Sequence, residues 1–132
     1  MIVADTSAWV EYLRNTGGPA HIALRGLIER DADIRVTEYV VMEVLAGARS
    51  RMEVTTLQSL MMSYPLLQLR GIADYEEAAE LYRTCRSKGE TIRKLNDCLV
   101  AVPVIREGAE LLHNDSDFDA IARHCDLRIY SV

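Results

Sequence analysis

The sequence AELLHNDSDFDAIA, residues 109–122, is an apolar run followed by three aspartates within five positions, Asp115, Asp117 and Asp119. A short apolar run that gives way to polar residues and a new apolar pattern is typical of a buried strand leading into a helix. Neighbouring carboxylates disfavour one another's ionised form, because like charges raise each pKa. The acids therefore either begin a helix and face water, or they surround a positive group.

The same alternation runs along the whole chain. Short apolar stretches predict strands at residues 1–4, 33–36, 66–69, 109–113 and 127–132. Helical periodicity covers residues 5–14, 20–31, 38–48, 55–64, 74–89, 96–108 and 116–124. Thr37 and Asn96 are the expected N-caps of two of these helices. Strands that alternate with helices predict an α/β fold, in which helices cover both faces of a parallel sheet.

Size and composition fit one globular domain spanning residues 1–132. Hydrophobic residues make up 49% and charged residues 27% of the chain, as in ordinary soluble proteins. We expect a cytoplasmic protein without a signal peptide or membrane span, since no apolar stretch approaches the roughly 18 residues that a span needs. The three cysteines match no C-x-x-C pattern and indicate reduced thiols. The net charge of −5 argues against a protein that coats nucleic acid nonspecifically.

Two acids follow predicted strands directly. Asp5 directly follows the first strand and Asp115 comes just after residues 109–114. Ligands of parallel sheets bind at the carboxyl ends of the strands, so both side chains are expected at one edge. The alternative for Asp5 is a helix N-cap, because Asp-Thr-Ser begins a helix well.

Two more acids lie on helices. Glu43 is the only charged residue between Tyr39 and Ala48, and a carboxylate on an apolar face is costly unless it is paired or bound to a metal. A solvated acid or a pair with an arginine are the alternatives. Asp97 lies in the first turn of its helix, where the helix dipole alone would stabilise an anion.

The remaining aspartates of the opening stretch have structural alternatives. Ser116 and Asp119 have the spacing of a capping box, which predicts a structural role for Asp119. Asp117 is either a first-turn acid or an outer metal ligand.

Converging carboxylates need positive charge among them. All-oxygen ligands favour Mg²⁺ or Mn²⁺, and such a site suits hydrolysis of a phosphodiester. The candidate ligands are Asp5, Glu43, Asp97 and Asp115, with Asp117 as a possible fifth. Thr6 and Ser7 have no neighbouring histidine to activate them, and are better suited to orienting water, metal or phosphate.

A basic turn precedes Asp97. Five of the fifteen basic residues lie between positions 83 and 94, namely Arg83, Arg86, Lys88, Arg93 and Lys94. Arg83 and Arg86 are explained by the dipole of a helix C-terminus. Arg93 and Lys94 are predicted to bind the phosphate backbone of a nucleic acid, so neutralising both should weaken that binding and flatten its salt dependence.

Together these segments resemble a known family. IVADTSAWVEYL, VVMEVLAG, LNDCLVA and ELLHNDSDFDAIA, in this order along the chain, resemble the PIN-domain ribonucleases, above all the VapC toxins of bacterial toxin–antitoxin pairs. The resemblance implies a PIN-like three-layer fold with a five-stranded parallel sheet. It also implies a Mg²⁺- or Mn²⁺-dependent endoribonuclease that acts on structured RNA, often tRNA or rRNA.

The resemblance further implies a homodimer that a cognate VapB antitoxin inhibits. Asp5, Glu43, Asp97 and Asp115 would form the acidic metal site, with Asp117 as a possible addition and Thr6 and Ser7 as the family's small hydroxyl residues. Pro103 inside a helix and Lys94 beside Asp97 depart from the family pattern.

Two alternatives differ from this function. A phosphoryl-accepting receiver domain would need adjacent acids after the first strand and a lysine after a late strand, and the chain has neither. A catalytically silent PIN-like scaffold that binds RNA or a partner is the remaining alternative.

Overall fold

The computed structural model describes residues 1–132 and contains a five-stranded sheet in the order β3-β2-β1-β4-β5. The strands are β1 (Ile2–Ala4), β2 (Ile34–Thr37), β3 (Leu66–Leu67), β4 (Glu110–Leu112) and β5 (Arg128–Ile129). Every neighbouring pair is parallel, which confirms the predicted sheet.

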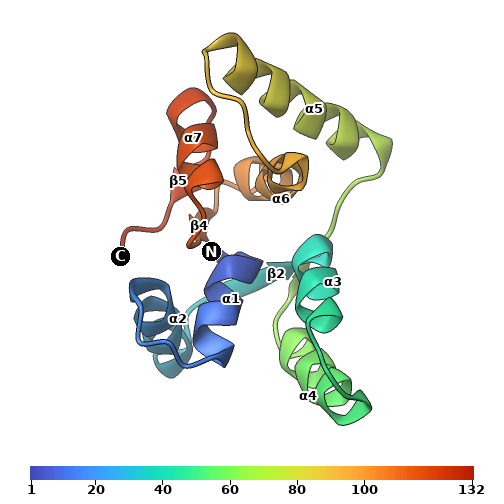
Figure 1. Ribbon diagram of the computed structural model, residues 1–132, viewed down its shortest axis with the longest axis vertical. Coiled ribbons are helices and arrows are strands. Elements are labelled where there is room, and N and C mark those ends of the chain that lie inside the picture. Colours follow the sequence, from blue (N-terminus) through green and yellow to red (C-terminus); the bar gives the residue numbers. More distant parts are fainter.

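Seven helices connect the strands. They are α1 (Thr6–Leu13), α2 (Pro19–Glu29), α3 (Glu38–Ala46), α4 (Arg51–Met62), α5 (Ile72–Ser87), α6 (Leu95–Arg106) and α7 (Ser116–His124). α1 and α2 lie on one side of the sheet, and α5, α6 and α7 lie on the other (Figure 1). The three-layer α/β arrangement expected from the sequence is therefore confirmed.

The core lies on both faces of the central strands. Val3, Ala4, Leu111 and Leu112 are completely buried. α6 is the most enclosed helix, because every residue from Asp97 to Val104 is buried. α6 also continues through the buried Pro103 to Arg106. This burial explains why its sequence is apolar all round, where a surface helix would have a polar face.

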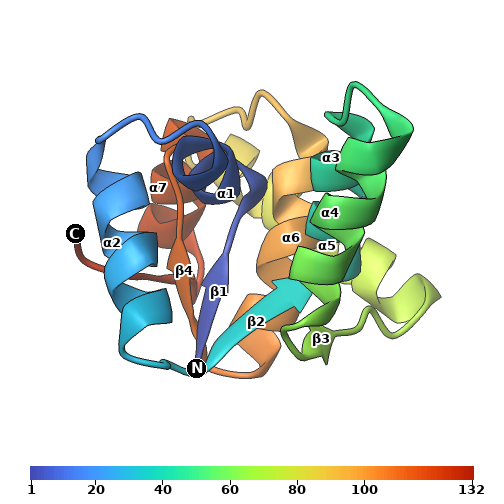
Figure 2. The ribbon, with the colours of Figure 1, turned by 90° about the horizontal axis from the view of Figure 1, so that it is seen from below.

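The sheet order reverses between β1 and β4. β2 and β3 extend the sheet on one side of β1, and β4 and β5 extend it on the other. Ala4 pairs with Leu112 at the end of both strands, and Figure 2 shows β1 and β4 side by side. The carboxyl ends of two such strands form the crevice in which open α/β sheets bind ligands. The residues that follow Ala4 and Leu112 therefore lie at this edge.

Of the two predicted helix N-caps, one is confirmed and one is wrong. Thr37 Oγ1 accepts the Val40 N–H at 3.3 Å and caps α3, as expected. The prediction for Asn96 was wrong, because α6 begins at Leu95 with Lys94 at the N-cap position. The Lys94 N–H instead donates to Asp117 Oδ2 at 3.1 Å, an acceptor from another helix that the local sequence does not reveal.

The structure also bears on the cysteines and on membrane-spanning segments. The three cysteines Cys85, Cys98 and Cys125 are free thiols, as predicted. No helix combines the length and the apolar character that crossing a bilayer requires.

Candidate active site

Asp5 serves as the N-cap of α1 at the end of β1. Its Oδ2 atom accepts the Ser7 N–H at 3.0 Å and the Ser7 hydroxyl at 2.6 Å. Ser7 Oγ in turn accepts the Asn114 N–H at 2.9 Å, which joins the loop after β4 to the start of α1. Asp5 is thus both the N-cap of α1 and a residue at the edge of the sheet. Ser7 joins the ends of β1 and β4 through its hydrogen bonds with Asp5 and Asn114.

Asp115 is the N-cap of α7, where its Oδ1 atom accepts the Asp117 N–H at 3.0 Å. The predicted capping box of Ser116 and Asp119 is therefore wrong. Ser116 is already the first helical residue, because the extended backbone that an N-cap requires occurs one residue earlier. Asp119 is exposed and lies 3.2 Å from His113 Nε2, so its structural role differs from the predicted one.

His113 is not among the predicted site residues, yet it holds the backbone of Asp115 in place. Its Nδ1 atom accepts the Asp115 N–H at 2.9 Å, while its ring packs against Phe118 at 5.3 Å between centroids. An acceptor at Nδ1 places the proton of the neutral ring on Nε2, toward Asp119. The sign of this contact in the sequence is that His113 lies two residues before Asp115.

Three carboxylates meet at the start of α6 and α7. Asp97, Asp115 and Asp117 each offer an oxygen atom, and these atoms lie within 4.8 Å of one another. Asp97 is 7% exposed, and its Oδ2 atom is the one buried carboxylate oxygen without a hydrogen bond. Burial, reinforced by the charge of Asp115, raises the pKa of Asp97 to about 7. The ionised form of Asp97 therefore lacks a full counter-charge.

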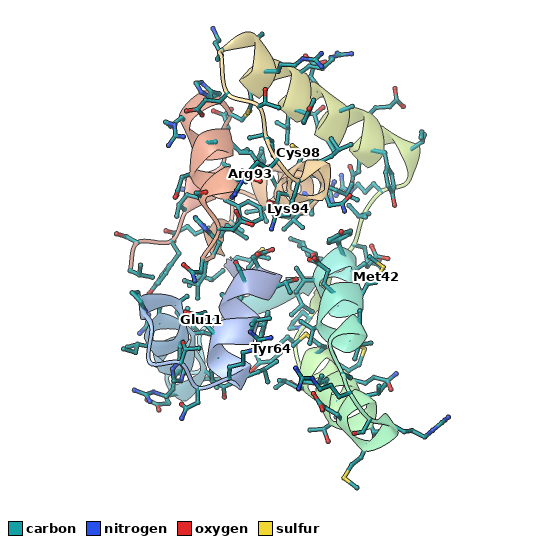
Figure 3. All side chains as sticks on the ribbon, viewed as in Figure 1. Glu11, Met42, Tyr64, Arg93, Lys94 and Cys98 are labelled. Carbon is teal, nitrogen blue, oxygen red and sulfur yellow. The ribbon has the colours of Figure 1, made fainter.

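Two basic side chains contact these acids, and Figure 3 labels both of them, Arg93 and Lys94, near the start of α6. Lys94 Nζ forms an ion pair with Asp115 Oδ2 and lies 4.0 Å from Asp97 Oδ2. Arg93 Nε contacts Asp117 Oδ1 at 3.3 Å, and Arg93 Nη2 lies 3.7 Å from Asp115 Oδ1. Burial tends to raise the pKa of Asp115, but the Lys94 ammonium and the Asp117 N–H outweigh it, and the net pKa is lowered.

Glu43 approaches the site from α3 and does not belong to the group of three. The Thr6 hydroxyl donates to Glu43 Oε1 at 2.7 Å, so the glutamate is neither free in solvent nor paired with an arginine. Tyr39 lies on the same helix and was missed from the sequence. Burial and the Glu43 carboxylate raise the pKa of its phenol, and Asp97 adds to the effect. Asp5 and Asp117 also contribute to the raised pKa of Asp97, so the carboxylates of Asp5, Asp97, Asp115 and Asp117 act on one region.

An open hollow of about 420 Å³ borders Asp115. Asn114 and Ser116 line it on one side, and Tyr130 and the C-terminal residues line the other. A strand end, a helix start and an aromatic side chain therefore surround a space directly beside the acids.

Comparison with known proteins places this geometry in a family. The PIN domain model matches residues 2–124. Ribonuclease VapC11 of Mycobacterium tuberculosis and VapC ribonuclease Mb1587 of Mycobacterium bovis are each 46% identical over 132 residues, which cover 99% of this chain and 98% of each relative. The chain belongs to the VapC ribonucleases of the PIN-domain family. The resemblance noted in the sequence is thereby confirmed.

Solved structures share the VapC fold at low sequence identity. VapBC2 from Rickettsia felis, bound to a DNA fragment from its promoter, superposes with a TM-score of 0.74 at 20% identity and covers 98% of both chains. VapC20 of Mycobacterium tuberculosis, described as a sarcin-ricin loop cleaving toxin, gives 0.69 at 18% identity and covers 97% of this chain and 99% of that one. At these identities the likeness supports the fold.

Proposed function

We propose that this VapC-family chain is a Mg²⁺- or Mn²⁺-dependent endoribonuclease toxin that cleaves structured RNA, either tRNA or rRNA. The observation that carries the proposal is the Asp97 carboxylate, which is buried, lacks a hydrogen bond at Oδ2 and lies beside two further carboxylates. A buried anion in this state needs a cation.

The donor set fits a hard divalent ion. Asp97 and Asp115 offer carboxylate oxygens, and Asp5 lies at the same edge of the sheet. Oxygen ligands suit Mg²⁺ and Mn²⁺, whereas a zinc site would normally include histidine or cysteine. When bound, such an ion makes water a better nucleophile near neutral pH and neutralises charge on a phosphate.

The chain's own residues would hold this centre in place. Ser7 fixes the Asp5 carboxylate against the loop after β4, and Thr6 fixes Glu43. In our proposal Asp5, Asp97 and Asp115 are direct ligands, and Glu43 acts through water. Asp117 uses both of its oxygens for Arg93 and the Lys94 N–H, so we assign it to positioning that turn.

The surroundings suit a nucleic-acid chain. The hollow beside Asp115 is open, and Tyr130 supplies an aromatic ring at its wall on which a base could stack. Arg93 remains 71% exposed despite its contacts, so its guanidinium is available to a phosphate.

We further propose that a VapB-type antitoxin inhibits the chain and that the chain itself forms a homodimer. VapBC complexes among the structures that share its fold support the antitoxin, and the homodimer is what the family resemblance of the sequence implies. Large apolar side chains are also exposed on α3, α4 and α5, among them Met42 (56%), Met52 (80%) and Ile72 (74%). In our proposal these side chains contact the antitoxin or the second copy of the chain.

Cleavage of a total tRNA and rRNA pool by antitoxin-free protein tests the enzymatic proposal. We expect discrete fragments with Mg²⁺ or Mn²⁺, no cleavage in EDTA, and no cleavage by Asp97→Asn. The ends of the fragments would identify the RNA and the cut position.

A folded wild-type protein that produced no metal-dependent cut would contradict the proposal. RNA or antitoxin binding without cleavage would then favour the silent scaffold.

A further inference from the structure

The Lys94 ammonium lies where a divalent ion is expected. Its Nζ atom contacts Asp115 Oδ2 and is 4.0 Å from Asp97 Oδ2, the oxygen without any hydrogen bond. These are two of the proposed metal ligands. The lysine therefore already partly neutralises the carboxylates that the ion would use.

The backbone of Lys94 is fixed, but its side chain is not enclosed. The Lys94 N–H donates to Asp117 Oδ2, which anchors the residue at the start of α6. Its side chain is 60% exposed, whereas the Asp115 side chain is only 10% exposed. The ammonium end of this ion pair is open to solvent, where charge pairing contributes little free energy, so the flexible lysine stem can leave the site at small cost.

We infer that Lys94 is a built-in occupant of the cation position, which a divalent ion displaces when it binds. The inference rests on the proposed metal site. An ammonium and a divalent ion repel each other and cannot share the same carboxylate oxygens. Arg93 differs, because its shorter contacts are with Asp117 and Ser116.

Displacement would couple metal binding to RNA binding. The released ammonium stays tethered at the start of α6, next to the acids and the hollow that borders Asp115. A phosphate bound to the metal would then find Lys94 free of its carboxylate partner. Lys94 thus neutralises the metal-free site and contacts the substrate backbone only after the ion has entered.

The movement can be followed by NMR, because Lys88 and Lys94 are the only lysines of the chain. Protein labelled with carbon-13 at lysine Cε gives one side-chain signal for each, assigned with Lys94→Met. We expect Mg²⁺ to shift the Lys94 signal and leave that of Lys88, which is exposed at the end of α5. The two signals are followed in one titration, so Lys88 is an internal control.

Calorimetric titration with Mn²⁺ gives the energetic counterpart. Lys94→Met keeps the length of the side chain and removes its charge, so Mn²⁺ should bind about threefold tighter, in line with the free energy of an exposed ion pair. Lys88→Met should bind Mn²⁺ as the wild type does. Far-ultraviolet circular dichroism checks that each variant is folded.

The outcomes separate this inference from the proposed function. If wild-type protein binds Mn²⁺ but the Lys94 signal does not move and Lys94→Met gains no affinity, the lysine lies outside the cation position and the inference is wrong. If neither wild type nor Lys94→Met binds Mn²⁺ or Mg²⁺, the metal site itself is wrong and the inference fails with it.

Discussion

Replacing Asp97 by asparagine should stabilise the metal-free protein near pH 8. The folded chain raises the pKa of this carboxyl from the usual 3.8 to about 7, chiefly through burial. A shift of about three units corresponds to roughly 4 kcal/mol against the ionised form, at about 1.4 kcal/mol for each unit. The asparagine amide needs partners of its own and offsets part of this gain, so we expect a net stabilisation of about 1–3 kcal/mol.

The gain should depend on pH in a defined direction. The raised pKa means that Asp97 favours folding fully below its unfolded pKa, and that this contribution is lost as the pH rises through about 7. Asparagine does not titrate. The difference in unfolding free energy between variant and wild type should therefore be small near pH 4 and largest above about pH 7.

Urea unfolding in EDTA at both pH values measures this difference. Trp9 is the only tryptophan and is completely buried, so its fluorescence reports on unfolding. Asp126→Asn, at an exposed position, is the matched control and should change little. Saturating Mg²⁺ should reverse the order, because a ligand that binds only the folded state stabilises it and the variant has lost a ligand. The reasoning is refuted if Asp97→Asn is no more stable than wild type near pH 8, or if its gain is equal at both pH values.

Three further predictions follow from single contacts. Thr6→Val should slow RNA cleavage by about tenfold without loss of folding, because it removes the hydrogen bond that holds Glu43. Thr6→Ser keeps the hydroxyl and should retain the rate. Equal initial rates of RNA cleavage for the two variants would contradict this prediction. Arg106 Nη1 lies 2.8 Å from the buried Asp74 Oδ1, so Arg106→Met should lower the unfolding free energy by about 3 kcal/mol, because it removes the counter-charge of that carboxylate. This loss of stability should shrink as the pH falls through the lowered pKa of Asp74. A loss that is independent of pH in urea unfolding would exclude this cause. Arg93→Gln should weaken RNA binding and reduce its salt slope by about one, as measured by filter binding at several salt concentrations; an unchanged slope would show that this arginine contacts no phosphate.

Features that follow from nearby residues could be predicted from the sequence. The strands were recognisable because buried parallel strands are short and apolar throughout. Asp5 and Asp115 could be placed at one edge because each comes within three residues of the end of a strand, and the pairing of Ala4 with Leu112 agrees with that placement. Thr37 could be identified as a cap because its acceptor atom and the N–H it binds lie three residues apart.

Contacts between distant segments could not be predicted in this way. Thr6 and Glu43 are 37 positions apart, and their hydrogen bond depends on how α1 and α3 are rotated against each other. Asn96 was chosen as a cap because its own side chain is suitable, but the carboxylate that binds the turn belongs to Asp117, 23 positions from Lys94.

The sequence by itself determined the α/β fold, the edge of the sheet that carries the acids, and the residue types that suit a divalent ion. The reason is that strand burial, helix periodicity and the position after a strand are properties of consecutive residues. Only the tertiary structure decided which carboxylates come within 4.8 Å of one another, that Asp97 lacks a partner at Oδ2, and that Lys94 reaches into the site. These features depend on the packing of α6 and α7 against each other, which fixes side chains from separate segments in space and changes the pKa of each through burial and neighbouring charge.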